Sequence, residues 1–130
     1  MTRRNLLSLL SLALALPCSA QRNPQPSFKG IELYSWQVDG RWTYVLLPGT
    51  NRNKSWQELQ RATQLDGEDK LKDALSLLAV GESVFWMNQC QQAPKNRLQF
   101  PDRAIRQQLS EYCRQLKIEL VLPANLRSND

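Results

Sequence analysis

The sequence predicts a small α/β or α+β domain, with a mixed sheet of about four strands covered by about three helices. Two patterns support this prediction. Residues 29–48 are rich in aromatic and β-branched side chains on either side of Asp39-Gly40, which predicts an N-terminal β-hairpin. Residues 83–122 follow a strand, helix, strand pattern, which predicts a βαβ unit with a right-handed crossover and parallel strands.

The predicted hairpin depends on a two-residue turn at Asp39-Gly40. These residue types accept the two positive φ angles of a type I′ turn, whose twist matches that of the flanking strands. A turn of this length fixes the register of the strands, and it places Trp36 opposite Thr43. Both faces of the hairpin then carry aromatic side chains.

Three helices are expected between and after the strands. The first covers residues 55–63 and begins with a capping box made by Ser55 and Glu58. The second starts at about Glu68, has one apolar face, and is expected to end at Gly81 as a left-handed cap. The third covers residues 102–116, between strands expected at 83–87 and 118–122.

The first twenty residues have the layout of a secretory signal peptide. A short cationic start precedes an apolar run over residues 6–16, and small residues lead up to Ala20. The run is about half of the roughly 20 residues that a membrane-spanning helix needs. We therefore expect an exported protein, periplasmic or secreted, that is cleaved after Ala20. Cys18 leaves the alternative of a lipoprotein, although Pro17 stands where a small residue is required.

The rest of the chain has a simple domain organisation. Residues 21–27 are polar and contain two prolines, which indicates a flexible lead-in. Residues 28–123 are expected to form a single globular domain, and residues 124–130 a frayed tail. No further membrane segment is expected after processing.

Charge and composition exclude several function classes. The chain carries a net charge of +5, and removal of the leader takes away two arginines and no acid, which leaves +3. This surplus is too small to indicate a dedicated nucleic-acid binder. The sequence contains no histidine, the commonest general base near neutral pH and the commonest zinc ligand. It also contains no phosphate-binding glycine loop, so no cofactor is expected.

Cys90 and Cys113 remain after processing, and export would allow them to form a disulfide. Their expected positions argue against it. Cys90 follows the strand at 83–87, whereas Cys113 lies near the far end of the helix at 102–116. At about 1.5 Å per residue these positions are roughly 15 Å apart, and bridged Cα atoms lie within about 7 Å. Both states remain open at this point.

Three regions are candidate binding sites, each with a plainer alternative. The first is the loop at 49–55, where amides and cations precede a helix N-terminus and would hold an anion. Its candidate residues are Asn51, Arg52, Asn53 and Lys54. The alternative is a solvated loop with an ordinary helix cap.

The second candidate is a set of six aromatic side chains, with Trp36 and Trp42 as the tentative ligand-binding residues: Tyr34, Trp36, Trp42, Tyr44, Trp56 and Trp86. On an uncovered sheet face they would form a platform for sugar rings or peptide; otherwise they pack in the core. The third is the loop at 88–100, with Lys95 and Arg97. It follows the carboxyl end of a strand, where α/β sheets commonly bind ligands. The alternative is a flexible connection without a function.

The stretch IELYSWQ, followed by the aromatic second strand and LLPGTNRNK, resembles small exported bacterial proteins of the ELYSWQ…LLPGTNR type, which have no known activity. The resemblance covers most of the processed chain. It implies a bacterial, exported, single-domain protein, and it implies no catalytic residue or cofactor.

Together these features favour an exported, soluble, non-enzymatic binding or accessory domain. Its expected partner is an anionic small molecule, an envelope polysaccharide or a protein. Two alternatives remain: a small histidine-free hydrolase or transferase acting outside the cytoplasm through carboxylate or lysine chemistry, and a binder of an anionic polymer.

Overall fold

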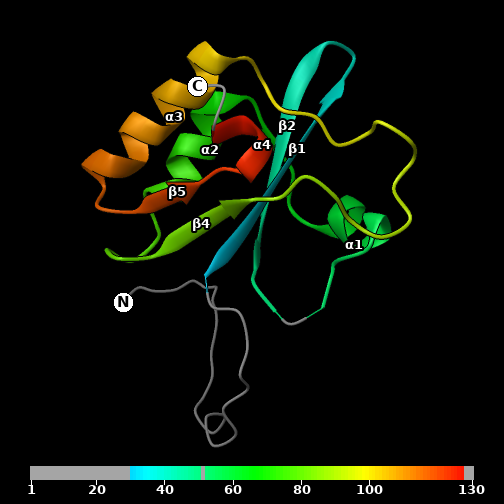
Figure 1. Cartoon of the computed structure of the whole chain (residues 1–130), viewed down its shortest axis with the longest axis horizontal. Coiled ribbons are helices and arrows are strands. Elements are labelled where there is room, and N and C mark those ends of the chain that lie inside the picture. The colour runs from blue at the N-terminus through cyan, green and yellow to red at the C-terminus, as the bar shows by residue number, and fades with distance from the viewer. Residues whose placement is uncertain (1–29, 51, 128–130) are drawn as a thin grey trace, which may run out of the picture.

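The computed structural model describes residues 30–50 and 52–127. The predicted signal peptide, its cleavage site, the lead-in at 21–27 and Asn51 lie outside the described residues. The described chain forms a five-stranded mixed sheet in the order β3-β2-β1-β4-β5, with four helices (Figure 1). The strands are β1 (Ile31–Val38), β2 (Arg41–Pro48), β3 (Leu65–Asp66), β4 (Ser83–Trp86) and β5 (Glu119–Val121). The helices are α1 (Trp56–Arg61), α2 (Glu68–Leu75), α3 (Arg103–Gln115) and α4 (Ala124–Arg127).

The N-terminal hairpin is confirmed in both turn and register. Asp39 and Gly40 have φ angles of 52° and 79°, as a type I′ turn requires. Strands β1 and β2 pair antiparallel, and Trp36 lies opposite Thr43. The local turn chemistry therefore determines the pairing of sixteen residues.

The C-terminal βαβ unit is also confirmed, because β4 and β5 pair in parallel on either side of α3 in the sequence. Strand β4 pairs in parallel with β1 as well, which joins the hairpin and the βαβ unit into one sheet. The fifth strand, β3, was not predicted. It is only two residues long, and it exists because Leu65 and Asp66 pair with β2.

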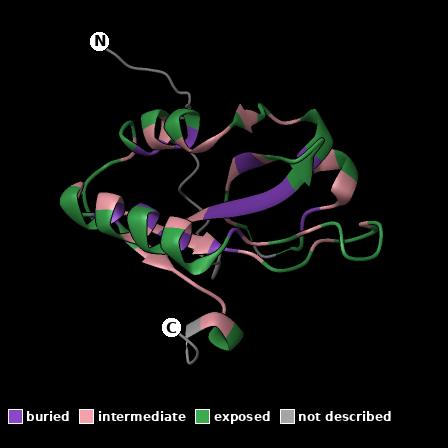
Figure 2. Cartoon of the chain, turned by 90° about the horizontal axis from the view of Figure 1, so that it is seen from above, coloured by how far each residue is buried: buried purple, intermediate pink, exposed green. Residues whose placement is uncertain are grey.

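Both faces of the sheet are covered. Strand alternation sends Leu33 to one face, where it packs with α2 and α3, and Tyr34 to the other. The second face is covered by α1, through Leu59, and by residues of the loop after β4. Figure 2 shows the buried strands at the centre and the exposed outer sides of the helices.

Two segments differ from expectation. Helix α2 ends at Leu75 rather than at Gly81, because residues 76–82 form turns that lead back to the sheet. This leaves Leu77 84% exposed. Residues 124–127, expected as the start of a frayed tail, form the short helix α4. Among the described residues no helix is both long and apolar enough to cross a bilayer.

Candidate functional site

The loop after β4 begins and ends beside strand β1. The Met87 N–H donates to the carbonyl of Leu33 at 2.8 Å, and the Gln99 N–H donates to the carbonyl of Ser35 at 3.0 Å. Residues 88–98 therefore form an excursion whose ends lie two residues apart on β1, and we call it the Ω-loop. Loops of this kind are compact and frequently functional.

The Ω-loop is also tied to the segment that begins α1. The Gln91 N–H donates to the carbonyl of Lys54, and the Trp56 N–H donates to the carbonyl of Gln91, both at 2.8 Å. Two segments more than thirty residues apart in the sequence thus lie side by side (Figure 1). Together they cover the second face of the sheet.

The Ω-loop surrounds a hollow of about 280 Å³ that is open to solvent. Its lining includes the amides Asn88, Gln89 and Asn96 and the cations Lys95 and Arg97. All five are exposed, and among the described residues neither cation forms an ion pair. The structure therefore brings the predicted residues Lys95 and Arg97 together in one concave, polar site.

Arg97 also covers the ring of Trp56, one of the aromatic side chains of the second candidate set. Its guanidinium carbon lies 5.5 Å from the ring centroid of Trp56, which is a cation–π distance. Trp56 in turn meets Trp36 edge to face, with centroids 4.9 Å apart. Trp56 as a whole residue is half-buried.

Of the two alternatives for the aromatic set, the structure shows core packing for Trp36 and Trp42, because both faces of the sheet are covered. Trp36 is only 1% exposed and belongs to the core beneath α1. Trp42 is half-buried and packs against the core on the opposite face. The two side chains therefore cannot present one common surface.

Lys54 is buried, contrary to the expectation of a solvated cation, with an exposed fraction of 5%. Its Nζ donates to Glu32 Oε1 at 3.1 Å and to Thr50 Oγ1 at 3.2 Å. The Tyr34 hydroxyl donates to the same Glu32 oxygen at 2.6 Å. Burial, followed by this hydrogen bond to Glu32, raises the pKa of Tyr34 well above its usual range.

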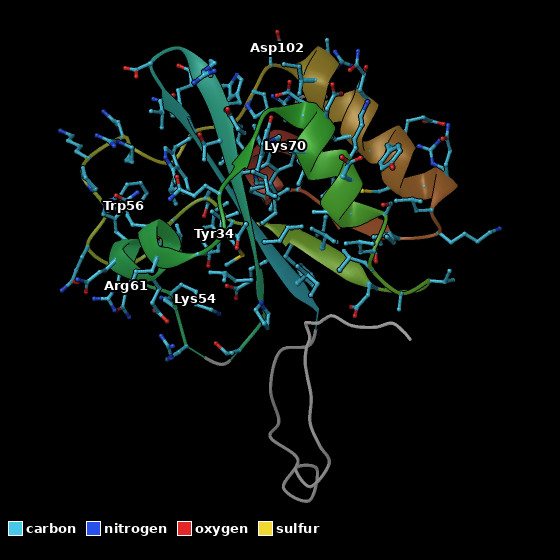
Figure 3. The ribbon with its side chains drawn as sticks, turned by 180° about the vertical axis from the view of Figure 1, so that it is seen from behind. Tyr34, Lys54, Trp56, Arg61, Lys70 and Asp102 are labelled. Atoms are coloured by element: carbon cyan, nitrogen blue, oxygen red, sulfur yellow. The ribbon has the colours of Figure 1, made fainter. Side chains whose placement is uncertain are left out.

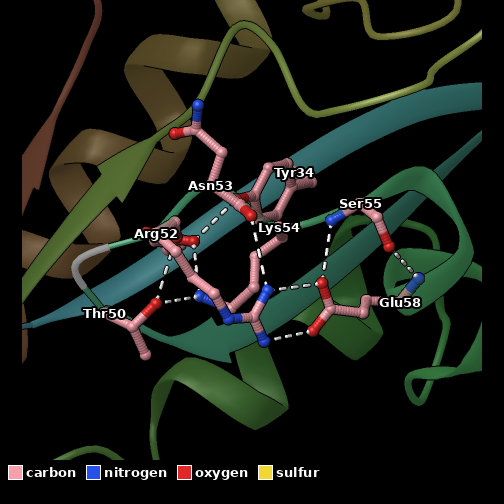
Figure 4. A network of polar contacts seen from close by, with 8 residues as sticks. Tyr34, Thr50, Arg52, Asn53, Lys54, Ser55 and Glu58 are labelled. Carbon is pink, nitrogen blue, oxygen red and sulfur yellow. Dashed lines mark hydrogen bonds and ion pairs between the residues drawn. The ribbon is translucent and has the colours of Figure 1, made fainter.

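The Arg52 side chain is likewise ion-paired within the protein (Figure 4). Its two terminal nitrogens donate to the two Glu58 oxygens at 2.9 and 2.7 Å. Ser55 and Glu58 form the predicted capping box. Hydrogen bonds from Arg52 and then from the Ser55 amide lower the pKa of Glu58 to about 2, and Glu58 raises the pKa of Arg52.

The loop at 49–55 is therefore not a ready anion site. Both of its cations form ion pairs with carboxylates of the protein itself. Asn51 lies outside the described residues. Asn53 is exposed, and its carbonyl accepts a hydrogen bond from Arg52 at 3.4 Å. One signal in the sequence pointed to this outcome: Glu32 is a charged residue within an apolar strand, and a buried charge requires a partner.

Cys90 and Cys113 are both free thiols. Cys90 packs with the core beneath α1, whereas Cys113 is buried in the core beneath α2 and α3, on the other face of the sheet. Burial raises the pKa of both thiols, that of Cys113 to about 11. Of the two states left open by the sequence, the structure has the unbridged one.

Within the described residues, no group of three or more acidic or cysteine side chains is arranged to hold a metal ion. No protein-family model, curated protein or solved structure matches the chain.

Proposed function

We propose that this chain is an exported, non-enzymatic binding or accessory domain that recognises an anionic partner. Its binding surface is formed by residues 49–50, 52–64 and 87–99, which we call the basic lobe. The lobe contains α1, the segment before it and the Ω-loop. The observation that supports this proposal is the separation of charge between the lobe and the rest of the domain.

The basic lobe contains five cations and one acid in its 28 residues. The other described residues contain ten acids and eight cations. The lobe therefore has a net charge of +4, whereas the remainder has −2. Without the buried ion pair of Lys54 and Glu32, which joins the two parts, the net charges are +3 and −1. The cations of the lobe are Arg52, Lys54, Arg61, Lys95 and Arg97, and its acid is Glu58.

Three of these cations are available to a partner. Lys54 and Arg52 are paired with carboxylates, but Arg61, Lys95 and Arg97 are exposed and form no ion pair among the described residues. Figure 3 places Arg61 and Trp56 in the same region, away from Lys70 on α2. Exposed ion pairs contribute up to about 1 kcal/mol each and weaken with salt, so we expect moderate, salt-sensitive binding.

The hydrolase or transferase alternative requires a desolvated lysine or a pair of carboxylates that opens into a pocket. Lys54 is desolvated, but its Nζ already donates hydrogen bonds to Glu32 and Thr50. This arrangement favours a role in stability for Lys54.

The proposal is tested by retention of the purified protein on dextran sulfate and the salt concentration that elutes it. The Lys95→Gln, Arg97→Gln variant should elute at markedly lower salt than the wild type. The Lys70→Gln, Arg114→Gln variant is the matched control, because it removes the same charge from exposed positions on α2 and α3. Equal elution of the two variants would contradict the assignment of binding to the lobe.

Export is tested separately, by intact-mass measurement of the protein recovered from the cytoplasm, the cell envelope and the medium. We expect a chain that starts at Gln21, with no lipid. A chain that still carries residues 1–20, recovered from the cytoplasm, would contradict the proposed location.

A further inference from the structure

We infer that the partner of the basic lobe is an acidic polysaccharide, and that one of its uronate units binds in the hollow of the Ω-loop. This inference rests on the proposed function and names its ligand. It follows from three observations: the side-chain chemistry of the lobe, the size of the hollow, and the contact between Arg97 and Trp56.

The basic lobe is rich in amide side chains. Asparagine and glutamine account for 10 of its 28 residues, against 5 of the other 69 residues in the described range. An amide side chain both donates and accepts hydrogen bonds, as a sugar hydroxyl does. A surface that only attracted charge would need cations alone, so the amides indicate a ligand that also carries many hydroxyl groups.

The hollow has the size for one small ring. Its volume of about 280 Å³ lies just below the range of roughly 300–1,000 Å³ typical of pockets for drug-sized ligands. Asn88 and Gln89 lie on its lining together with Lys95 and Arg97. Hydroxyl-binding and carboxylate-binding groups therefore surround the same space.

Arg97 connects the hollow to the aromatic ring of Trp56. It lines the hollow and also lies over the indole, at 5.5 Å from the ring centroid. A guanidinium binds a carboxylate through two parallel hydrogen bonds. A uronate held in this way would have its carboxylate on Arg97 and the next sugar unit beside the half-buried Trp56, whose ring offers an apolar surface.

The same observations disfavour a nucleic acid. The binding of nucleic acid depends on Lys and Arg side chains that neutralise a run of backbone phosphates, whereas the lobe has three exposed cations outside ion pairs within the described range. Binding of single strands relies on several aromatic side chains that stack successive bases. Trp56 is the single aromatic residue in the sequence of the lobe.

The experiment compares four probes by calorimetric titration of the purified protein: oligogalacturonate, neutral oligogalactan, polyglutamate and oligo-dT. Oligogalacturonate should bind at least about tenfold more tightly than each of the others, because it alone offers both carboxylates and hydroxyls. Arg97→Gln should weaken this binding by about tenfold, the effect of losing a charge-assisted hydrogen bond.

The Asn88→Ala, Gln89→Ala variant tests the sugar contacts directly. It should weaken oligogalacturonate binding by about fivefold or more and leave weak polyglutamate binding unchanged. The matched control is Gln107→Ala, Gln108→Ala, which removes two exposed amides from α3. Circular dichroism spectra would confirm that the variants remain folded.

The outcomes separate this inference from the proposed function. If polyglutamate or oligo-dT binds as tightly as oligogalacturonate, or if the Asn88→Ala, Gln89→Ala variant binds oligogalacturonate normally, the polysaccharide assignment is wrong and the anion-binding function stands. If none of the three polyanions binds, and dextran sulfate does not retain the protein, both proposals are wrong.

Discussion

Replacing Lys54 with methionine tests how the buried charges hold the basic lobe on the sheet. The substitution keeps the length of the apolar stem but removes the ammonium group. Glu32, which is 3% exposed, then remains buried with a hydrogen bond from Tyr34 and without its positive partner. The lobe segment that carries Lys54 also loses its polar tether to β1.

The expected destabilisation follows from the geometry. Two unit charges 3.1 Å apart attract by about 5 kcal/mol at an effective dielectric constant of about 20. Breaking one side of a buried ion pair typically costs about 3–5 kcal/mol. Because the Tyr34 hydroxyl still donates to Glu32, we expect about 3 kcal/mol. For a domain of this size that lowers Tm by about 12–24 °C.

Urea unfolding followed by tryptophan fluorescence measures this change. The Glu32→Gln, Lys54→Met double variant removes both charges and should recover most of the lost free energy of unfolding. Arg52→Gln is the control within the same loop. Arg52 is 63% exposed, so solvent screens its ion pair with Glu58, and loss of this pair should lower the free energy of unfolding far less than loss of the Lys54 charge. Two results would contradict this expectation. One is that Lys54→Met lowers the free energy of unfolding no more than Arg52→Gln does, and the other is that the double variant is no more stable than Lys54→Met.

Three further predictions concern single positions. The low pKa of Glu58, about 2, stabilises the fold above the ordinary carboxyl pKa of 4.5 and is lost as pH falls toward 2. Acid unfolding should therefore be steeper for the wild type than for Arg52→Gln; parallel pH profiles would contradict this. Gly30→Ala should destabilise the fold by about 1–3 kcal/mol in urea unfolding, because φ is +121° and an added Cβ would lie 2.8 Å from a β4 carbonyl oxygen; unchanged stability would count against the strain. The thiols of Cys90 and Cys113 should react slowly with maleimide near neutral pH, and Cys113 should be labelled fully only after unfolding, as mass spectrometry would report. Rapid labelling of both thiols in the native protein would contradict their burial.

Features that depend on neighbouring residues were predictable from the sequence. The type I′ turn at Asp39-Gly40 set the hairpin register, since a two-residue connection leaves a single alignment of its strands. The capping box at Ser55 was predictable because its two partners are three residues apart on one helix turn. The position of α3 followed from the periodicity of its apolar side chains, and the strands on either side of it from short runs rich in apolar residues.

The character of the candidate site was not predictable in this way. Arg52 and Lys54 look like free cations in the sequence, and only the fold brings Glu32 from β1 to Lys54 across 22 residues. The same holds for the Ω-loop, whose two ends meet on β1, and for Arg97, which the fold places over Trp56. Local sequence determines turns, caps and periodic faces, because their energies arise between residues a few positions apart. Whether a charge is buried and paired or exposed and available depends on which distant segments cover it, and that was decided by the tertiary structure alone.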